Sequence, residues 1–361
     1  MSDSMRRFRA IREGLNKLYP KQVKGNLVRH LNTLAALISG IVGSHSTHLP
    51  KIAAKVPDGS QVESRTKRFS RWINNEKIDR DLYFLPFAEA LLLSLSIETL
   101  VLVIDGSVVG RGCITLMVSV IYKGRALPIA WTVVKGKKGH FPEDAHIDLV
   151  QQVKSLVPEG AQVVFLGDGE FDGVNLQETI EDYGWKYVFR TGININIFWE
   201  DYELSCGDLA FHLKPGEWIG IPDVLFTNEK YGLVMLICWW REGCEKPIYL
   251  VTNMDSVEDA YAYYSKRFRI ETFFSDQKSR GFNIHKSHLS DPKRLSRLLI
   301  AACLAYIWIV YLGVLCMRDG WNKIIHRKNR CDLSLFQLGL RLLDHFLNEG
   351  LPIHVAFQIP H

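Results

Sequence analysis

The sequence lacks the signatures of several common protein classes. It has seven cysteines, an odd number, and no two stand at Cys-x2-Cys spacing, which argues against a disulfide framework and against a zinc finger. No phosphate-binding G-x-x-x-x-G-K-S/T loop is present, and no segment is of low complexity or repeats at a fixed period. The N-terminal charges are not followed by the apolar core of a signal peptide. We therefore expect a folded protein in a reducing compartment.

The chain has one long run without a charged residue, at residues 298–317. These 20 residues are enough to cross a membrane, and Arg297 and Arg318 flank the run. The alternative is a helix buried inside a large domain. The overall composition, 47% hydrophobic and 23% charged residues, is that of an ordinary folded soluble protein, so we expect burial and no membrane partner.

The net charge of +5 is unevenly distributed. Residues 1–80 hold 16 Lys and Arg against 6 Asp and Glu, and residues 261–330 hold 14 against 4, a surplus of ten in each region. The rest of the chain is acidic. Two basic regions around an acidic centre favour a polyanion held at two places, although solvated helix faces could give the same pattern.

The basic N-terminal region reads as short helices joined by tight breaks. Residues 27–42 and 64–74 are predicted helices, and the second carries Phe69, Trp72 and Ile73 on its apolar side. This series fits a DNA-binding unit similar to a helix-turn-helix, and it fits other small helical bundles as well.

The centre of the chain alternates between strand and helix patterns. Runs rich in β-branched residues and amphipathic segments follow in the order strand, strand, strand, helix, strand, helix, strand. They lie at residues 99–104, 113–122, 125–134, 144–156, 162–166, 174–183 and 186–190. This order matches the ribonuclease H-like fold, an α/β fold with a mixed sheet and helices on both faces. In that fold the first and fourth strands are parallel neighbours.

The sequence character changes again in the second half. Four runs rich in aromatic and β-branched residues predict an all-β insertion, at residues 195–203, 217–226, 232–241 and 247–252. One long helix is predicted next, at 257–279, followed by C-terminal helices at 292–317 and 333–347. We therefore predict five segments: a helical DNA-binding domain at 1–80, the core at 97–191, the β insertion at 192–253, the rest of the core at 254–300 and C-terminal helices at 301–361.

Two acidic residues end neighbouring strands of the predicted sheet. Asp105 follows the first strand and Asp168 follows the fourth. Because those strands are expected side by side, the two carboxylates are expected to be neighbours. Asp is also common in the turns after strands, so neither residue is decisive by itself.

The predicted helix at 257–279 carries a third acid among polar partners. Tyr264, Arg267, Glu271 and Lys278 are spaced by 3, 4 and 7 residues, so a continuous helix would project all four from one face. A phenol, a guanidinium, a carboxylate and an ammonium make a poor core stripe. They suit a phosphodiester and a metal ion, although ordinary ion pairs on a solvated face are the alternative.

The pattern Tyr264-x2-Arg267-x3-Glu271-x6-Lys278 reproduces the Y-R-E-K signature, so the chain resembles the DDE transposases of the insertion sequence 4 family. The resemblance extends over about residues 27–300, including the β insertion. Within it, VIDGS and FLGDGEF resemble the two segments that carry the catalytic aspartates of that family, here Asp105 and Asp168.

One departure concerns the residue after the second aspartate. The family often has a basic residue there, whereas this chain has Gly169 followed by Glu170. Whether Glu170 or Asp172 assists the site is left open.

The resemblance implies a DNA transposase that binds insertion-sequence ends, cleaves them and joins them to target DNA by hydrolysis and transesterification. Asp105, Asp168 and Glu271 are implied as catalytic residues and as ligands of two Mg²⁺ ions, which Mn²⁺ could replace. The implied partners are double-stranded DNA and, on paired ends, a second copy of the chain. The implied location is the bacterial cytoplasm, in association with the nucleoid.

Further residues are implied as DNA contacts. Arg267 and Lys278 would bind phosphates near the scissile bond, and Tyr264 would donate a hydrogen bond to one. Trp239 and Trp240 lie where the family stacks a flipped base on an aromatic residue. Because neighbouring residues of a strand point to opposite faces, only one of them is expected to be exposed.

Two other functions remain open at this point. A catalytically silent, DNA-binding repressor descended from a transposase would share the resemblance. A nuclease of the same fold would hydrolyse DNA and never join strands.

Overall fold

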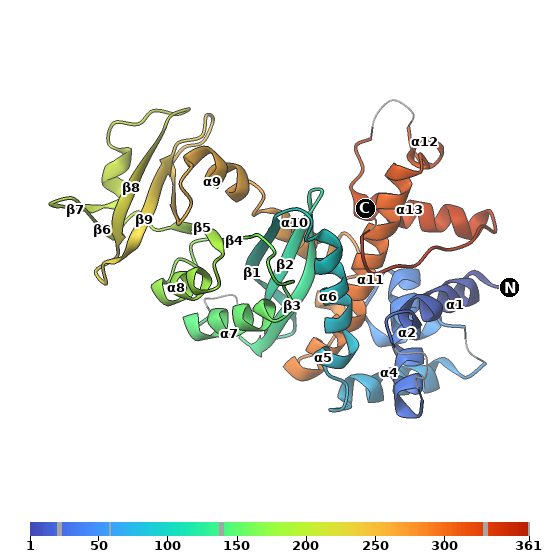
Figure 1. The fold of residues 1–361 in the computed structure, drawn as a ribbon. Helices are drawn as coiled ribbons and strands as arrows, with labels where there is room; N and C mark the ends of the chain where they lie inside the picture. Colours follow the sequence, from blue (N-terminus) through green and yellow to red (C-terminus); the bar gives the residue numbers. More distant parts are fainter. Residues whose placement is uncertain (20–23, 58, 137–140, 328–330, 360–361) are drawn as a thin grey trace.

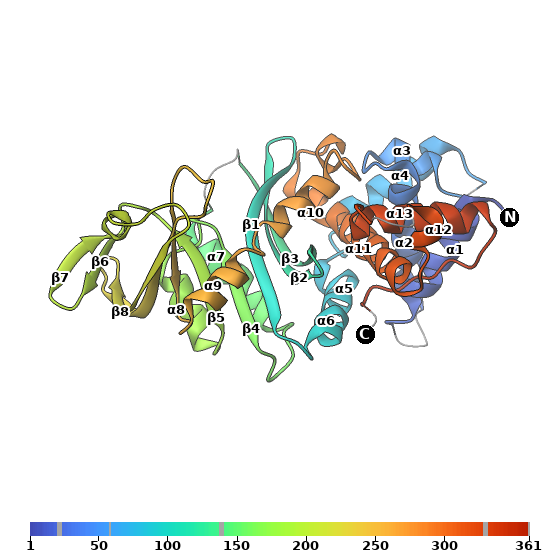
Figure 2. The same ribbon diagram turned by 90° about the horizontal axis from the view of Figure 1, so that it is seen from above.

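The computed structural model describes residues 1–19, 24–57, 59–136, 141–327 and 331–359. Figures 1 and 2 show a sheet with its covering helices on one side and a group of helices, built from both ends of the chain, on the other. The helices are α1 Asp3–Asn16, α2 Asn26–Ser44, α3 Leu49–Ala54, α4 Val62–Asn74, α5 Arg80–Tyr83, α6 Leu85–Leu95, α7 Glu143–Lys154, α8 Val174–Asp182, α9 Val257–Tyr264, α10 Arg269–Gln277, α11 Pro292–Arg318, α12 Asn322–Ile325 and α13 Leu335–Asn348. The strands are β1 Leu100–Gly110, β2 Cys113–Tyr122, β3 Arg125–Lys135, β4 Val163–Gly167, β5 Lys186–Thr191, β6 Asn196–Trp199, β7 Tyr202–Ser205, β8 Trp218–Phe226, β9 Tyr231–Trp239 and β10 Ile248–Thr252.

The first five strands have the order of a ribonuclease H-like sheet. Their order is β3-β2-β1-β4-β5, with β2 antiparallel to β1 and β3, and with β1, β4 and β5 parallel. Continuous buried runs in β1, β2 and β4 show that this sheet is covered on both faces. Lys123 and Gly124, both at positive φ, make the two-residue turn between β2 and β3. The fold class predicted from the strand order is confirmed.

Strand β1 is longer than the sequence predicted. It continues through Asp105 to Gly110, because β2 pairs with it along that whole length, whereas its pairing with β4 ends at Val103 opposite Leu166. Asp105 therefore lies inside a strand and not after it. It remains beside Asp168, because β4 ends at the same level of the sheet.

The β insertion extends the core sheet. Strand β10 pairs antiparallel with β5, and the order then continues β10-β9-β8-β6-β7, so all ten strands form one sheet. The single strand predicted over residues 195–203 is two strands, β6 and β7, joined by a tight turn at Glu200, which has positive φ. Figure 2 shows these strands at the far end from the helical part.

The long helix predicted at 257–279 is two helices. Helix α9 ends at Tyr264, four residues form tight turns, and α10 begins at Arg269. Across the break the backbone bonds join residues three apart, as from the Glu271 amide to the Phe268 carbonyl. Ser256 caps the start of α9 by accepting a hydrogen bond from the Asp259 amide.

Helix α11 is the centre of the helical part. Asp291 caps its start, with Pro292 in the first turn, and 94% of its most apolar window is buried. Helices α2, α4 and α13 all pack on it, so both ends of the chain contribute to one helical body. The apolar run at 298–317 is thus in the core of the protein, as predicted, because helices and strand β3 cover it.

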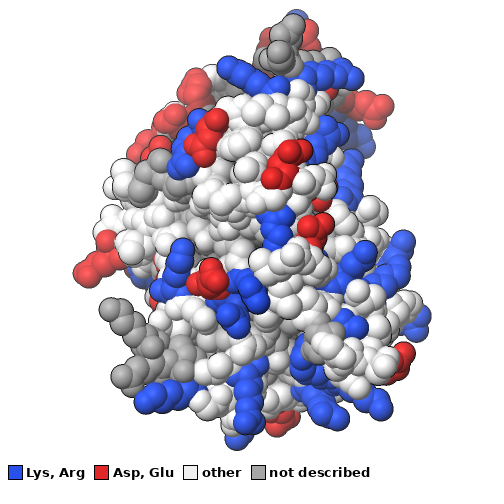
Figure 3. All heavy atoms as spheres, turned by 90° about the vertical axis from the view of Figure 1, so that its right-hand side faces the viewer, with Lys and Arg blue, Asp and Glu red and all other residues white. Residues whose placement is uncertain are grey.

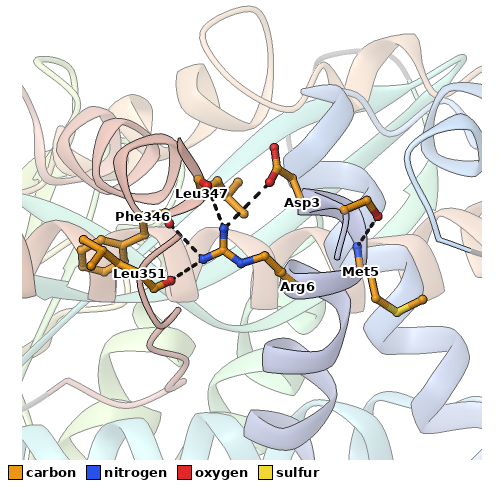
Figure 4. A network of polar contacts seen from close by, with 7 residues as sticks. Asp3, Met5, Arg6, Phe346, Leu347 and Leu351 are labelled. Carbon is orange, nitrogen blue, oxygen red and sulfur yellow. Dashed lines mark hydrogen bonds and ion pairs between the residues drawn. The ribbon is translucent and has the colours of Figure 1, made fainter. Parts of the chain in front are cut away.

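Arg6 of α1 ties the two ends of the chain together (Figure 4). Its guanidinium donates hydrogen bonds to the carbonyls of Phe346 and Leu347, at 3.0 and 2.7 Å, and to that of Leu351. The first two carbonyls belong to the last turn of α13, where they also accept the amides of Leu351 and Gly350, and the third lies just after the helix. A cation there also opposes the negative end of the helix dipole.

Helices α11 and α13 approach closely where each has a glycine. A Cβ added to Gly339 would overlap the Ile309 carbonyl, and one added to Gly313 would overlap the Leu335 carbonyl. Both obstacles are backbone, so neither can rotate away.

We expect Gly339→Ala to lower the free energy of unfolding by about 1–3 kcal/mol or more, because the helices must separate to admit the methyl group. Chemical denaturation measures this loss. Gly59→Ala is the matched control, since a Cβ at Gly59 meets nothing within 4 Å. Equal stability of the two variants would contradict the close packing.

Candidate functional site

Asp105 and Asp168 lie at the point where β4 ends beside β1. The Asp105 carboxylate accepts a hydrogen bond from the Gly106 amide at 2.7 Å, and that of Asp168 accepts one from the Glu170 amide at 3.1 Å. Both face a cavity of about 550 Å³. Glu271, Lys278 and Glu170 also line this cavity, so the structure brings together the three acids that the sequence singled out.

The cavity holds an excess of negative charge. Burial and the nearby carboxylates of Asp168 and Glu271 raise the pKa of Asp105 to about 7, against the opposing effect of Arg267 and the Gly106 amide. A divalent cation between these carboxylates would compensate that charge. Hard cations such as Mg²⁺ prefer carboxylate oxygens, so the donor set fits this metal.

Glu271 is paired with Arg267 in this structure. The Arg267 Nη2 donates to the Glu271 Oε1 at 2.7 Å, and the Glu271 side chain is 57% exposed against 16% for Arg267. Within the described ranges, no three His, Cys, Asp or Glu side chains converge closely enough to hold a metal. Binding of a cation by all three acids therefore requires Glu271 to turn from Arg267 toward the two aspartates.

Tyr264 and Lys278 complete the Y-R-E-K set. The Tyr264 ring lies beside the Arg267 guanidinium, 5.9 Å from the ring centre, and burial raises the pKa of its hydroxyl. Lys278 donates to the Ser107 hydroxyl on β1 at 2.6 Å. Although the helix is broken, the tight turns keep Tyr264, Arg267 and Glu271 together, and Lys278 reaches the same cavity from the end of α10.

Glu170, whose role the sequence left open, has a defined position. It accepts a hydrogen bond from the Phe141 amide at 2.6 Å, and its carboxylate lies 3.6 Å from the buried His146. Asp172 does not line the cavity and instead accepts a hydrogen bond from Thr191 at 2.6 Å. Of the two candidates, Glu170 is the one at the site. Ser107 is a residue that the sequence analysis missed, since no spacing rule marks a serine within a strand.

The two tryptophans of the insertion lie at the end of β9. Trp239 stacks on Tyr261 of α9, with ring centres 3.7 Å apart. Trp218 of β8 stacks on Trp239 as well, with ring centres 5.9 Å apart. The Trp240 indole donates to the Cys244 carbonyl at 2.9 Å. Trp239 and Trp240 are both half-buried. Strand alternation predicts one buried and one exposed tryptophan, but the strand ends at Trp239, so the alternation does not reach Trp240. Trp218, at 41% exposed, is the most accessible of the three.

The helical part carries much of the basic surface. Figure 3 shows Lys and Arg gathered over the lower half of its outer face, with few Asp and Glu among them. The exposed basic residues of the N-terminal helices and their connections are Arg9, Lys17, Lys24, Arg29, Lys51, Lys55, Lys67, Arg71 and Lys77. This surface matches the charge surplus of the N-terminal region.

The fold and the carboxylate cavity define a ribonuclease H-like protein with an acidic site at the end of its central strands. The sequence profile of the family described as "Transposase DDE domain" matches residues 100–308, more than half of the chain. The chain therefore belongs to that family of transposases. No curated protein gives a significant match.

Two solved structures match the chain at low similarity. One is the piggyBac transposase in a synaptic complex with hairpin DNA, with 13% identity, a TM-score of 0.46, and 96% of this chain and 78% of that chain covered. The other is human ENDOV, with 13% identity, a TM-score of 0.25, and 62% of this chain and 96% of that chain covered. The ribonuclease H-like fold follows from the strand order, and membership of the transposase family follows from the family match.

The helix that carries Glu271 is held by a buried ion pair. Asp276 of α10 is 5% exposed and accepts a hydrogen bond from Arg125 of β3 at 2.9 Å, beside Tyr306 of α11. Burial raises the pKa of Asp276 to about 6, because the nearby Arg125 and Arg280 offset only part of the desolvation.

We expect Asp276→Asn to gain stability relative to wild type as the pH rises. A folded-state pKa above the unfolded value means that Asp276 stabilises the fold most below pH 4 and loses that contribution as the pH passes 6. The difference between the two unfolding free energies should grow by up to about 3 kcal/mol between pH 4 and pH 8. Denaturation across this range measures it. If the unfolding free energy of wild type rises relative to that of the variant as the pH increases, the ion pair with Arg125 stabilises charged Asp276 by more than burial destabilises it.

Proposed function

We propose that the chain cleaves insertion-sequence ends and joins them to target DNA. The observation that carries this proposal is the meeting of Asp105, Asp168 and Glu271 in one cavity of a chain that belongs to the DDE transposase family. The Y-R-E-K set around Glu271 supports membership of the insertion sequence 4 group in particular.

Asp105, Asp168 and Glu271 would hold two Mg²⁺ ions, and Mn²⁺ could replace them because it accepts the same oxygen ligands. When bound, the metal activates the attacking oxygen and stabilises the leaving one. The chain itself must place the phosphate and keep the carboxylates charged. A cation at the cavity favours the charged form of Asp105, whose pKa is about 7 without it.

Arg267 and Lys278 stand on either side of Glu271 and would bind the phosphates next to the scissile bond. A phosphate that draws Arg267 away would also release Glu271 from its present partner, so that DNA binding favours assembly of the metal site. Tyr264 would donate a hydrogen bond to the backbone. Trp239 and Trp240 stay proposed stacking residues for an unpaired base.

The basic N-terminal helices would bind the element ends, and two copies would pair when both ends are held. Pairing supplies two active sites for two ends. The natural setting for this activity is the nucleoid in the bacterial cytoplasm, where the DNA lies. The five-segment division, with the DNA-binding unit at 1–80, is part of the same proposal.

We expect Mg²⁺ to raise the melting temperature of the protein by a few degrees, because a ligand at a hundred times its Kd stabilises the fold by about 2.7 kcal/mol. Glu271→Gln should reduce this shift. Arg267→Gln should increase it, because the competing partner of Glu271 is gone. Lys266→Gln is the matched control and should leave it unchanged. A smaller shift in Arg267→Gln would contradict competition between Arg267 and the metal.

The cleavage test uses a supercoiled plasmid that carries the element ends, with Mg²⁺ or EDTA. Wild type should nick at the ends only with Mg²⁺. Glu271→Gln and Asp168→Asn should be slower by at least about a hundredfold, the upper end of the roughly 10–100-fold loss for residues that only orient metal ligands. Glu258→Gln, an exposed acid on α9, is the control and should cut normally.

The same reaction separates the alternatives. Joined products that contain both end and target DNA support the transposase. Cutting without joining under the same conditions would make the chain a nuclease. Binding of the ends without metal-dependent cutting would make it a silent binder and overturn the proposed function.

A further inference from the structure

A second and larger cavity, of about 780 Å³, lies at the opposite end of β1 from the acidic site. The start of β1 forms its floor, the turn between β2 and β3 forms one wall, and the break between α9 and α10 forms another. The end of α6 closes it. Neither the family match nor the Y-R-E-K residues give this cavity a role.

Three cations surround this cavity: Lys123 on the β2–β3 turn, and Lys266 and Arg269 at the helix break. In the described part of the chain, none of them forms an ion pair. Each instead lies against an aromatic ring, as Lys266 does with Tyr263 at 4.6 Å. One acid, Glu98, also lines the cavity. Three cations against one acid favour an anionic polymer, and the two tyrosines could stack on planar groups that it carries.

The break between α9 and α10 joins this cavity to the acidic site. Arg267 and Glu271 point to one side of it, whereas Lys266 and Arg269 line the cavity on the other. Even in a continuous helix, Arg267 and Glu271, four residues apart, would share one face, and Lys266 and Arg269, three apart, would share another. The tight turns at the break keep these two pairs on different sides.

We propose that this cavity, which we name the flank groove, binds the phosphates of the DNA strand that runs on from the cleavage position. This inference rests on the proposed function. The groove reaches β1 at Leu100 and Val101, five residues before Asp105, which is about 16 Å along a strand. At about 3.4 Å per nucleotide in duplex DNA, the groove takes phosphates roughly five nucleotides from the cleaved bond.

Charge and shape favour this occupant over others. The lining mixes apolar side chains, such as Leu95, Ile97 and Ile121, with the three cations, and its surplus of positive charge favours a polyanion over an apolar helix of a partner protein. Lys, Arg and Tyr side chains are common phosphate ligands and carry no sequence preference. The contact should therefore be independent of sequence and sensitive to salt.

The test measures binding of a labelled duplex that carries the element end and 12 base pairs beyond the cleavage position, in EDTA, at 50–200 mM KCl. The triple variant Lys123→Gln, Lys266→Gln, Arg269→Gln loses three phosphate contacts. Its salt slope should fall by about 2.7, which weakens wild type roughly 40-fold more than the variant over this range. Cutting the duplex back to two base pairs beyond the cleavage position should weaken wild type and leave the variant unchanged.

Three further variants separate charge from structure. Lys123→Arg with Lys266→Arg should keep the wild-type slope, and Glu98→Gln should bind the long duplex more tightly because a repulsive charge is removed. Lys154→Gln is the matched control, since Lys154 also lies over aromatic rings, Tyr183 and Trp185, but outside the flank groove. Each variant must melt at the wild-type temperature.

The outcomes are distinguishable from those of the proposed function. A triple variant with the wild-type slope and the same dependence on flank length overturns the flank groove, while cleavage by wild type leaves the transposase proposal intact. A wild type that neither binds nor cuts the element ends overturns both.

Discussion

The candidate site depends on two half-buried acids, Asp105 and Asp168, which lie where β4 ends beside β1. Burial of Asp105 and the nearby charge of Asp168 raise the pKa of Asp105 to about 7. A fold keeps such a pair only where something else gains from it. Here the sheet order brings the acids together, the helix break presents Glu271 and Arg267 to them, and the buried Asp276 and Arg125 hold that helix in place.

Much of the fold could be predicted from the sequence because local signals agreed. Strand β2 was predicted to the residue, and the Lys-Gly turn fixed its pairing with β3. The errors arose where tertiary contacts decide. The pattern at Asp105 looked like a strand end, yet pairing with β2 carries β1 five residues further. The segment 257–279 has no proline or glycine to mark the break between α9 and α10, so its pattern looked like one helix.

The candidate site was visible in part. Two acids after strands and a polar helix face marked Asp105, Asp168 and Glu271 as candidates, and the resemblance to the Y-R-E-K signature singled them out. The sequence could not show that Glu271 pairs with Arg267 when no metal is bound, because this pairing depends on the distances between side chains in the folded protein. The position of Glu170 depends on its hydrogen bond with Phe141, and that of Ser107 on its hydrogen bond with Lys278. No spacing in the sequence indicates either contact. The Y-R-E-K pattern singled out Arg267, whereas Lys266 and Arg269 were counted only as charge, and it is the three-dimensional arrangement that places those two at a separate cavity.

The central claim is that the three acids form one metal site. Fe²⁺ bound in place of Mg²⁺, with ascorbate and peroxide, produces hydroxyl radicals that cut the protein chain next to the ion. We expect three cuts, near Asp105, Asp168 and Glu271. Excess Mg²⁺ should suppress all three cuts, and DNA should make all three stronger. Cuts confined to other segments, or an unchanged pattern in Asp168→Asn, would contradict it.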